Sequence, residues 1–285
     1  MIRTYSALNI ALRKELEQAG IEAARLEARE IVCAAAEKTK EQFYRDMSLY
    51  ASEAVEERCA WLMKRRLAGE PVAYITGKWE FYGIDLEVNS SVLIPRVDTE
   101  VLAEEAIALL KDKEEALVLD LCCGSGCIGI SIAVNVPGAK VMLADMSDLA
   151  LSVAERNIAH TGLSERVAAI KADALKEPPP MKRAFDMIVC NPPYIPAWEI
   201  DMLDVSVKDY EPHMALDGGE DGFDFFDPIC FNWKSALKRM GYLIFECGIG
   251  QADKVAKIMK LNGYVNIRTL KDTGGVDRVV IGQAE

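Results

Sequence analysis

Long apolar runs are missing from this 285-residue chain, and histidines are scarce. No stretch approaches the roughly 18 uninterrupted apolar residues that a membrane-spanning helix needs. The first residues run straight into a polar-studded helical pattern without a signal-like apolar core, so we expect a soluble, cytoplasmic protein. We expect no chemical role for the two histidines, His160 and His213.

The cysteines exclude disulfide and zinc chemistry. Eight cysteines in a chain of this length do not form the disulfide framework of a small secreted domain. Cys122, Cys123 and Cys127 lack a downstream Cys or His group at zinc-finger spacing. We therefore expect reduced thiols and no metal site.

The chain has fewer basic than acidic residues, 33 Lys/Arg against 45 Asp/Glu, which gives a formal net charge of -12. Residues 1–70 are balanced, with 12 Lys/Arg and 12 Asp/Glu, whereas residues 71–285 hold 21 basic and 33 acidic side chains. An acidic domain repels phosphate backbones, which argues against extended duplex DNA as a partner. The one basic run, Lys64-Arg65-Arg66, is explained equally well as a solvated helix end.

The first 70 residues have helical patterning, in a chain long enough for two domains. Residues 5–19, 22–36 and 52–68 are the predicted helices, and glycines follow the first and the last of them. Leucines at four-residue spacing mark the buried face of the first helix. We therefore predict a small helical bundle over residues 1–70.

The pattern changes twice after residue 70. Aromatic and β-branched residues over 74–92, punctuated by glycine and asparagine, predict a short hairpin inside a linker of 71–94. From 95 to 285, apolar strands alternate with helices, which predicts an α/β domain with a parallel sheet covered on both faces. The last two strands lie too close together for a helical crossover, so they should pair antiparallel. The expected strands are 116–121, 140–144, 167–171, 185–190, 240–247, 264–270 and 277–282, and the expected helices are 127–134, 149–160, 223–239 and 251–261.

A glycine-rich turn, here called the glycine loop (residues 122–126), joins the first of these strands to a helix. Its glycines allow the main chain to approach a ligand closely, and the helix start offers unpaired N–H groups. Asp145 ends the next strand, where a carboxylate accepts both hydroxyls of a ribose. A nucleoside-bearing cofactor is therefore predicted. The residues expected around it are Asp120, Cys122, Cys123, Gly124, Ser125, Gly126, Asp145, Asp173, Ala174 and Asn191.

The identity of that cofactor rests on less specific signals. The glycines 124, 126 and 129 also satisfy the dinucleotide fingerprint G-x-G-x-x-G, so a dehydrogenase stays open. Asp120 suits a cationic methionyl group better than a pyrophosphate, which favours S-adenosylmethionine. Asp173 is placed to meet an adenine amino group, but an aspartate in a surface turn is an equally good interpretation of this residue. Asp145 has an alternative interpretation as an ordinary helix-capping aspartate.

The tetrapeptide Asn191-Pro192-Pro193-Tyr194 directly follows a strand with a buried pattern. Ligands of open parallel sheets bind beyond the carboxyl ends of the strands, so this segment should face the glycine loop. Consecutive prolines have fixed φ angles and no N–H, and they present carbonyl acceptors only. The Asn191 oxygen and the Pro192 carbonyl would each accept one N–H of a planar amine, and Tyr194 would stack on it. The tetrapeptide predicts methylation of a planar NH₂ group, with Asn191, Pro192 and Tyr194 as catalytic residues and all four as substrate-binding residues.

Two other functions remain open on the residues alone. An exocyclic amine of adenine in DNA or RNA has the same planar geometry, but base flipping normally comes with a basic channel or a target-reading domain. A cofactor-binding module without turnover is the second alternative, and the intact Asn191 and Tyr194 argue against it.

Over nearly its whole length the chain resembles the bacterial peptide chain release factor glutamine methyltransferases, the HemK/PrmC family. Besides the helical N-terminal domain, the glycine loop and the tetrapeptide, the resemblance rests on short motifs elsewhere. Those motifs are Tyr74-Ile75-Thr76-Gly77, Phe81-Tyr82-Gly83, Leu93 to Glu100, Glu211-Pro212, Ala215-Leu216, Gly218-Gly219, Phe245-Glu246-Cys247-Gly248 with Gln251, and Asp277-Arg278.

The resemblance implies a Rossmann-like class I methyltransferase fold and methyl transfer from S-adenosylmethionine to the glutamine amide of the release factor Gly-Gly-Gln motif. It implies that Asn191 and Pro192 orient the amide, that residues 122–126 and Asp145 hold the methyl donor, and that the helical domain helps to grip the release factor. The expected partner is a release factor, without membrane or direct nucleic acid binding, and the expected state is a monomer.

Two departures from the family pattern stand out. Cys122 and Cys123 replace the first Gly and the Thr of the usual Asp-Leu-Gly-Thr-Gly-Ser-Gly loop, which should narrow the turn without abolishing it. Val97 stands where the family usually has a second proline. Neither change touches an inferred reactive atom. We interpret Gly218, Gly219 and Gly222 as turn glycines and Glu246 as a residue that orients its neighbours.

Overall fold

The computed structural model describes residues 3–285, and the chain divides into two compact units. One unit runs to Lys78 and also includes Val205–Tyr210 from much later in the chain, whereas the other comprises Trp79–Asp204 and Glu211–Glu285. No local pattern in the sequence indicates that this later segment belongs to the helical unit. Among residues 3–285, no helix has both the length and the apolar character needed to cross a membrane.

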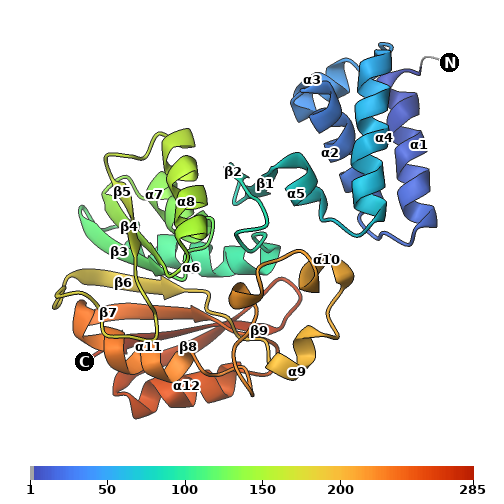
Figure 1. Cartoon of the computed structure of the whole chain (residues 1–285). Helices are drawn as coiled ribbons and strands as arrows, with labels where there is room; N and C mark the ends of the chain where they lie inside the picture. The colour runs from blue at the N-terminus through green and yellow to red at the C-terminus, as the bar shows by residue number, and fades with distance from the viewer. Residues whose placement is uncertain (1–2) are drawn as a thin grey trace. The chain divides into compact units, whose positions relative to one another are not determined.

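The helical unit is a bundle whose first helix buries the predicted leucine face, because Leu8, Leu12 and Leu16 are all buried. Side-chain caps define the helix starts: the Thr4 hydroxyl accepts from the Ala7 N–H, and the Ser52 hydroxyl accepts from the Val55 N–H. Its helices are α1 (Tyr5–Gln18), α2 (Ala24–Ala36), α3 (Lys40–Arg45), α4 (Glu53–Leu67), α5 (Val72–Thr76) and α10 (Val205–Lys208) (Figure 1).

The predicted hairpin begins later than the sequence analysis placed it. Residues 72–76 form helix α5 instead, which begins after Pro71 and ends at Gly77 with φ 71°. The two strands are β1 (Lys78–Phe81) and β2 (Ile84–Glu87), and Tyr82 and Gly83 between them both have positive φ. Aromatic and β-branched residues start before the hairpin, so composition alone put its first residue too early.

The second unit contains a seven-stranded sheet with the strand order β5-β4-β3-β6-β7-β9-β8. β9 is antiparallel to both of its neighbours, and the other pairs are parallel, as predicted for the fold. β9 returns between β7 and β8, a position that local pattern did not indicate. The strands are β3 (Ala116–Leu121), β4 (Ala139–Asp145), β5 (Val167–Lys171), β6 (Phe185–Cys190), β7 (Leu237–Glu246), β8 (Tyr264–Lys271) and β9 (Asp277–Ala284).

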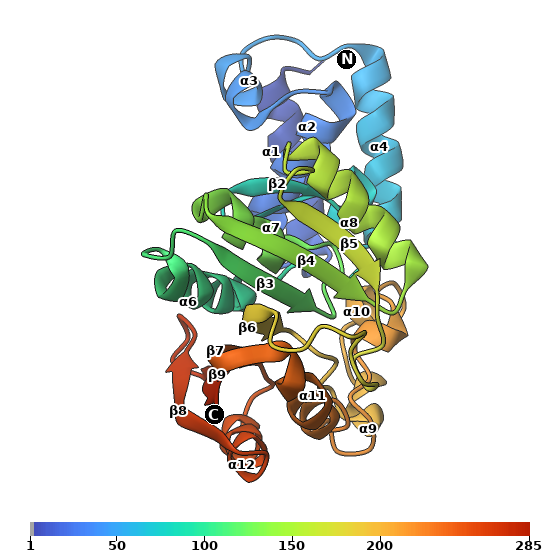
Figure 2. The ribbon, with the colours of Figure 1, turned by 90° about the vertical axis from the view of Figure 1, so that its left-hand side faces the viewer.

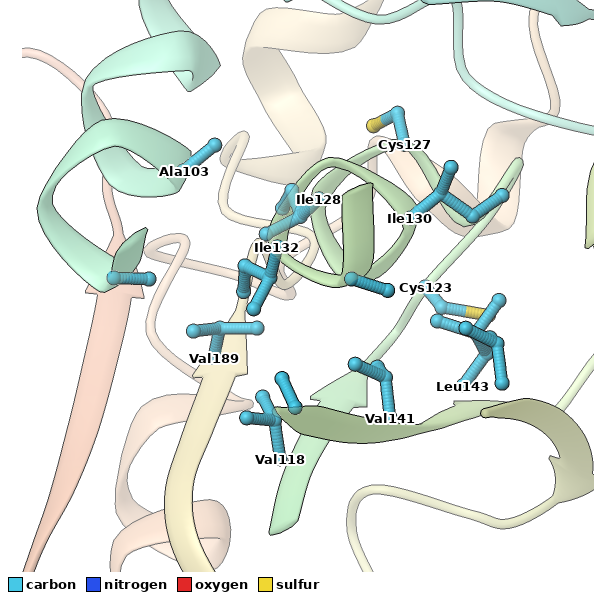
Figure 3. Close-up of a cluster of buried hydrophobic side chains, with 14 of the residues drawn as sticks. Ala103, Val118, Cys123, Cys127, Ile128, Ile130, Ile132, Val141, Leu143 and Val189 are labelled. Carbon is cyan, nitrogen blue, oxygen red and sulfur yellow. The ribbon is translucent and has the colours of Figure 1, made fainter. Parts of the chain in front are cut away.

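Helices cover both faces of this sheet, as Figures 1 and 2 show. Alternate residues of β3 point to opposite layers: Val118 packs with α6, α7 and α8, whereas Leu119 packs with α11 and α12. In the first layer, Ile132 of α7 points toward Val189 of β6 (Figure 3). The helices are α6 (Glu100–Leu110), α7 (Cys127–Asn135), α8 (Asp148–His160), α11 (Phe226–Trp233) and α12 (Ala252–Leu261), with the short α9 (Ala197–Ile200) in a loop.

One predicted helix is wrong in length. The apolar pattern over 223–239 predicted a single helix, but α11 ends at Trp233, and the strand β7 already begins at Leu237, opposite Phe185. Trp233 is buried and its indole N–H donates to the Ala174 carbonyl. A short run of buried apolar residues fits a helix or a strand equally well, and only the pairing partner decides between them.

Candidate functional site

A cavity of about 620 Å³ lies at the carboxyl edge of the sheet, within the second unit. This volume is in the range of small-molecule sites, and the position is where open α/β sheets bind ligands. Its walls are formed by four groups of residues: several from 91–99, Cys122 to Ser125 of the glycine loop with the start of α7, Asp145 and residues that follow β4, β5 and β6, and several from 212–217 with Phe225. The cavity therefore unites the two segments that the sequence analysis singled out. The predicted cofactor residue Gly126 is not among the wall residues.

The glycine loop adopts a conformation that few residues other than glycine tolerate. Cys122, Gly124 and Gly126 have φ angles of 61°, 53° and 81°, in the left-handed region. A Cβ placed at Gly126 would lie 2.7 Å from Leu143 Cδ1, so the loop also packs tightly against the layer below. Cys122 thus occupies the left-handed conformation that glycine adopts most easily, at the position where the family usually has a glycine.

Asp145 lies at the cavity wall and supports the loop from the side. Its Oδ2 accepts from the Gly124 N–H at 2.9 Å, and its Oδ1 accepts from the Ser147 N–H at 2.9 Å. Burial raises the pKa of Asp145. Because the carboxylate lies in the cavity wall and has up to four acceptor sites, it is able to accept a hydroxyl donor from a ligand in the cavity.

Asp120 lies beneath the loop and is not part of the cavity wall. It is fully buried, and its Oδ2 accepts from the Gly129 N–H at 2.8 Å in the first turn of α7. Burial raises the pKa of Asp120 to about 7. Its hydrogen bond ties the end of β3 to the first turn of α7, and its direct contact with a methionyl group stays a prediction.

The remaining wall suits an adenosine-bearing ligand. Met146, Ala174 and Leu175 offer apolar surface beside Asp145. The hydroxyl-bearing residues Thr99 and Ser125 also line the cavity, and both are buried.

Asp173 also lines the cavity but is partly engaged. It accepts from the Leu175 N–H at 3.0 Å and pairs with Lys176 at 3.0 Å, and this lysine lowers the pKa of the carboxyl. Its contact with an adenine amino group therefore stays a prediction. The lone pairs of the carboxylate that these partners do not use would make that contact.

The tetrapeptide continues from β6, a strand whose six residues are all buried. Asn191 and Pro193 are in the cavity wall, and Pro192 is buried just behind it. The register places Cys190 opposite Leu121, so the glycine loop and the tetrapeptide leave adjacent strands at the same level. The predicted juxtaposition of the two segments is therefore present.

Tyr194 is oriented from behind the cavity. Its hydroxyl donates to Glu246 Oε1 at 3.1 Å, and the Glu246 side chain is buried at the end of β7. Burial raises the pKa of both groups. The Tyr194 phenol therefore keeps its proton at neutral pH and is a donor, not a base.

Several wall residues were missed by the sequence analysis. His213, to which we assigned no role, lines the cavity and lies 3.8 Å from Asp217. Arg96 lines it as well and is paired with the buried Glu211, which also accepts from the Ile94 N–H at 3.1 Å. The short family motifs within residues 93–100 and 211–219 were the signal that could have identified these wall residues. The two segments come together only in the tertiary fold. The missed wall residues include Ser91, Val92, Leu93, Pro95, Arg96, Thr99, Met146, Ser147, Leu175, Pro212, His213, Met214, Asp217 and Phe225.

Two family models match consecutive parts of the chain. Residues 8–77 match the PrmC N-terminal domain, and residues 97–203 match the methyltransferase small domain. The chain is also similar to the catalytic domain of hMettl16, solved in complex with the MAT2A 3'UTR hairpin 6, with a TM-score of 0.58 and 14% identity over 82% of this chain and 83% of that one. At that identity, the likeness shows a shared fold only.

The family of the chain is shown by its similarity in sequence to relatives over most of its length. The chain is 40% identical to the release factor glutamine methyltransferase of Geobacter sulfurreducens, over 95% of this chain and 93% of the relative. It is 42% identical to the enzyme of the same name from Clostridium acetobutylicum, over 74% of each chain. The chain therefore belongs to the release factor glutamine methyltransferase family, whose enzymes use S-adenosylmethionine.

Proposed function

We propose that this protein transfers a methyl group from S-adenosylmethionine to the side-chain amide nitrogen of the glutamine in the Gly-Gly-Gln motif of peptide chain release factors. The observation that carries the proposal is that residues of the glycine loop, Asp145 and Asn191 all line the same cavity. Family membership supplies the substrate class.

Glycine-loop residues and Asp145 hold the donor in this proposal. The donor supplies an electrophilic methyl group on a sulfonium. Asp145 would accept the ribose hydroxyls, and Met146 and Leu175 would cover the adenine. Asp120 would act indirectly, because its hydrogen bond with the Gly129 N–H ties the strand before the loop to the helix after it.

Asn191 and Pro192 orient the acceptor nitrogen. The Asn191 side-chain oxygen and the Pro192 carbonyl each accept one N–H of the glutamine amide, which directs the nitrogen lone pair at the methyl carbon. The same two acceptors stabilise the partial positive charge that grows on nitrogen as the N–C bond forms and the S–C bond breaks. The amide proton leaves to water afterwards, so no strong base is required, in keeping with a Tyr194 that retains its proton.

Glutamine rather than adenine is favoured by charge. The one basic run of the chain is partly neutralised within its own unit: Arg65 pairs with Glu70, and Arg66 pairs with Glu27. The second unit has an excess of acidic residues. A nucleic acid substrate would need a basic track to neutralise its phosphates, and neither feature provides one.

To test the proposal, the enzyme is incubated with methyl-labelled S-adenosylmethionine and, in parallel reactions, with a release factor, duplex DNA or single-stranded RNA. Mass spectrometry then locates the label. We expect one added methyl on the glutamine of the Gly-Gly-Gln motif and no label on nucleic acid. Label on adenine and none on glutamine would overturn the proposed substrate. A release factor with Gln replaced by Glu in that motif is the matched control, because it removes only the NH₂ group.

A further inference from the structure

The segment that follows the tetrapeptide is paired with a later loop of the chain, residues 216–219. Ile195 donates to the Leu216 carbonyl at 3.0 Å and accepts from the Gly218 N–H at 2.8 Å. The Ala197 N–H donates to the Gly219 carbonyl at 2.8 Å. The main chain beyond Tyr194 is therefore paired with residues 216–219 like a short stretch of parallel sheet.

Gln251 joins these segments at the start of α12. Its Nε2 donates to the Tyr194 carbonyl at 2.9 Å and to the Gly222 carbonyl at 3.4 Å, and its Oε1 accepts from the Gly248 N–H at 2.8 Å. The side chain is only 8% exposed. One amide group therefore binds the end of the tetrapeptide, the 218–222 loop and the turn after β7.

The glycines around Gln251 are required for space. A Cβ placed at Gly218 would lie 2.7 Å from Tyr194 Cα, and one at Gly222 would lie 2.4 Å from the Tyr194 oxygen. A Cβ at Gly248 would lie 2.9 Å from Gln251 Oε1. Gly222 also has a positive φ of 80°, as expected for a turn glycine, but Gly218 and Gly248 have no such angle. Close approach to Tyr194 and Gln251 explains these two glycines, where the sequence analysis saw in Gly218 only a turn.

We propose that Gln251 is a positioning residue for methyl transfer, which acts by fixing the Tyr194 carbonyl and through it the direction of Asn191. This inference rests on the proposed function. Two prolines with fixed φ separate Asn191 from Tyr194, so a displacement at Tyr194 is passed along a stiff connection. With the hydroxyl of Tyr194 held by Glu246 and its carbonyl held by Gln251, both ends of the residue are fixed. A misplacement of about 1 Å in a reacting group costs on the order of 10² in rate.

Gln251→Met and Gln251→Glu test this role. Met removes the amide at similar volume, and Glu keeps the shape but replaces the donor N–H groups with oxygens that face two carbonyls. In both variants we expect kcat to fall at least about 10-fold, with KM for the release factor and Kd for S-adenosylmethionine within about twofold of wild type. Retention of wild-type kcat by both folded variants would overturn the proposal.

Arg166→Met is the matched control for stability. The Arg166 guanidinium also ties loops together, because it donates to the carbonyls of Ala133, Val136 and Ala139. These carbonyls lie at the end of α7 and the start of β4, the opposite edge of the sheet from the cavity. We expect this variant to lose stability but to keep kcat. An equal loss of kcat in the control would identify general loosening, and not positioning, as the cause.

Hydrogen exchange gives a readout that does not depend on turnover. In Gln251→Met the amides of Ile195 and Ala197 should exchange at least about 10-fold faster than in wild type, whereas Arg166→Met should leave them unchanged. Unchanged exchange would refute the positioning role even if the wild-type enzyme failed to methylate a release factor. That failure would instead refute the proposed function, so the two outcomes are separate.

Gly218→Ala probes the same contact from the other side. The added methyl pushes on the Tyr194 main chain, and we expect kcat to fall with little change in Kd for the methyl donor. Gly138→Ala is the control, because its Cβ would lie 2.1 Å from the Glu114 carbonyl oxygen, an equally crowded main-chain contact far from Tyr194. A kcat loss of the same size in both glycine variants would contradict the specific role of the Tyr194 contact.

Discussion

Two loops at one edge of the sheet are held in place by different means. The glycine loop after β3 is shaped locally, because three of its five residues have positive φ and the Gly124 N–H of its main chain donates to the nearby Asp145 carboxylate. The tetrapeptide after β6 is shaped by distant residues: Glu246 holds the Tyr194 hydroxyl, and Gln251 holds the Tyr194 carbonyl.

This difference corresponds to two different tasks. A loop that binds a ligand through its main chain needs small residues and unusual dihedral angles. A group that must point at a reacting nitrogen needs a fixed direction, and side-chain hydrogen bonds from several elements supply it. Changes in the glycine loop should therefore act mainly on donor affinity and stability, and changes around the tetrapeptide mainly on kcat.

Asn191→Ala should produce the largest effect. Loss of one of the two acceptors that stabilise the transition state is expected to lower kcat by about 10² to 10³, while Kd for S-adenosylmethionine stays within a few-fold. Single-turnover kinetics and calorimetry measure the two quantities. Unchanged turnover would show that Asn191 does not orient the acceptor, and a lost donor affinity would place it with the glycine loop.

Asp120→Asn should change the pH dependence of stability. The folded protein keeps the Asp120 proton up to a pKa of about 7, whereas the unfolded chain releases it near pH 4. The stability from this group is therefore present at low pH and is lost as pH rises through that window. Relative to Asp120→Asn, the wild type should lose about 3 kcal/mol of unfolding free energy between pH 5 and pH 8.

Urea unfolding of both proteins at the two pH values, without donor, measures this difference. Parallel pH profiles for wild type and Asp120→Asn would mean that Asp120 titrates in the folded protein as it does in the unfolded chain.

Gly126→Ala should weaken donor binding and stability together. The new methyl would meet Leu143 at 2.7 Å and Ile130 at 3.2 Å, in a residue with φ 81°. We expect a loss of about 2 kcal/mol in the free energy of unfolding and a weaker donor affinity. Gly250→Ala is a suitable control, since it also has a positive φ of 77° but its Cβ would meet no atom within 4 Å. An equal loss in both would assign the effect to φ alone.

Cys122→Gly should have the smallest effect and the opposite sign. Cys122 has a φ of 61°, so glycine relieves left-handed strain while adding entropy to the unfolded chain. We expect a gain of up to about 1 kcal/mol in the free energy of unfolding, with kcat unchanged. Thermal unfolding measures it, and a clear loss of stability would mean that packing of the Cys122 thiol outweighs the backbone strain.

The local sequence pattern was sufficient to predict most of the strands of the second unit. The strands β3, β5 and β6 begin and end where apolar runs and turn residues predicted, because parallel strands buried on both faces need continuous apolar sequence. The glycine loop could be predicted as well, since its geometry depends on residues next to each other in the chain.

Elsewhere the prediction failed where partners are distant. Residues 234–239 follow a helix and read as its continuation, yet pairing with β6 converts their end into strand β7. Val205–Tyr210 lacks any local mark of belonging to the helical unit. His213 and Arg96 reach the cavity only because residues 91–99 and 212–217 are brought to the same edge.

The sequence by itself determined the fold class, the glycine loop and the tetrapeptide, because each depends on the dihedral preferences and burial of consecutive residues. Only the tertiary structure decided how the tetrapeptide is held. Glu246 and Gln251 lie more than 50 residues from Tyr194 along the chain, and their hydrogen bonds to it form only when β6 and β7 pair. Periodicity and local dihedral preference carry no information about partners at that separation.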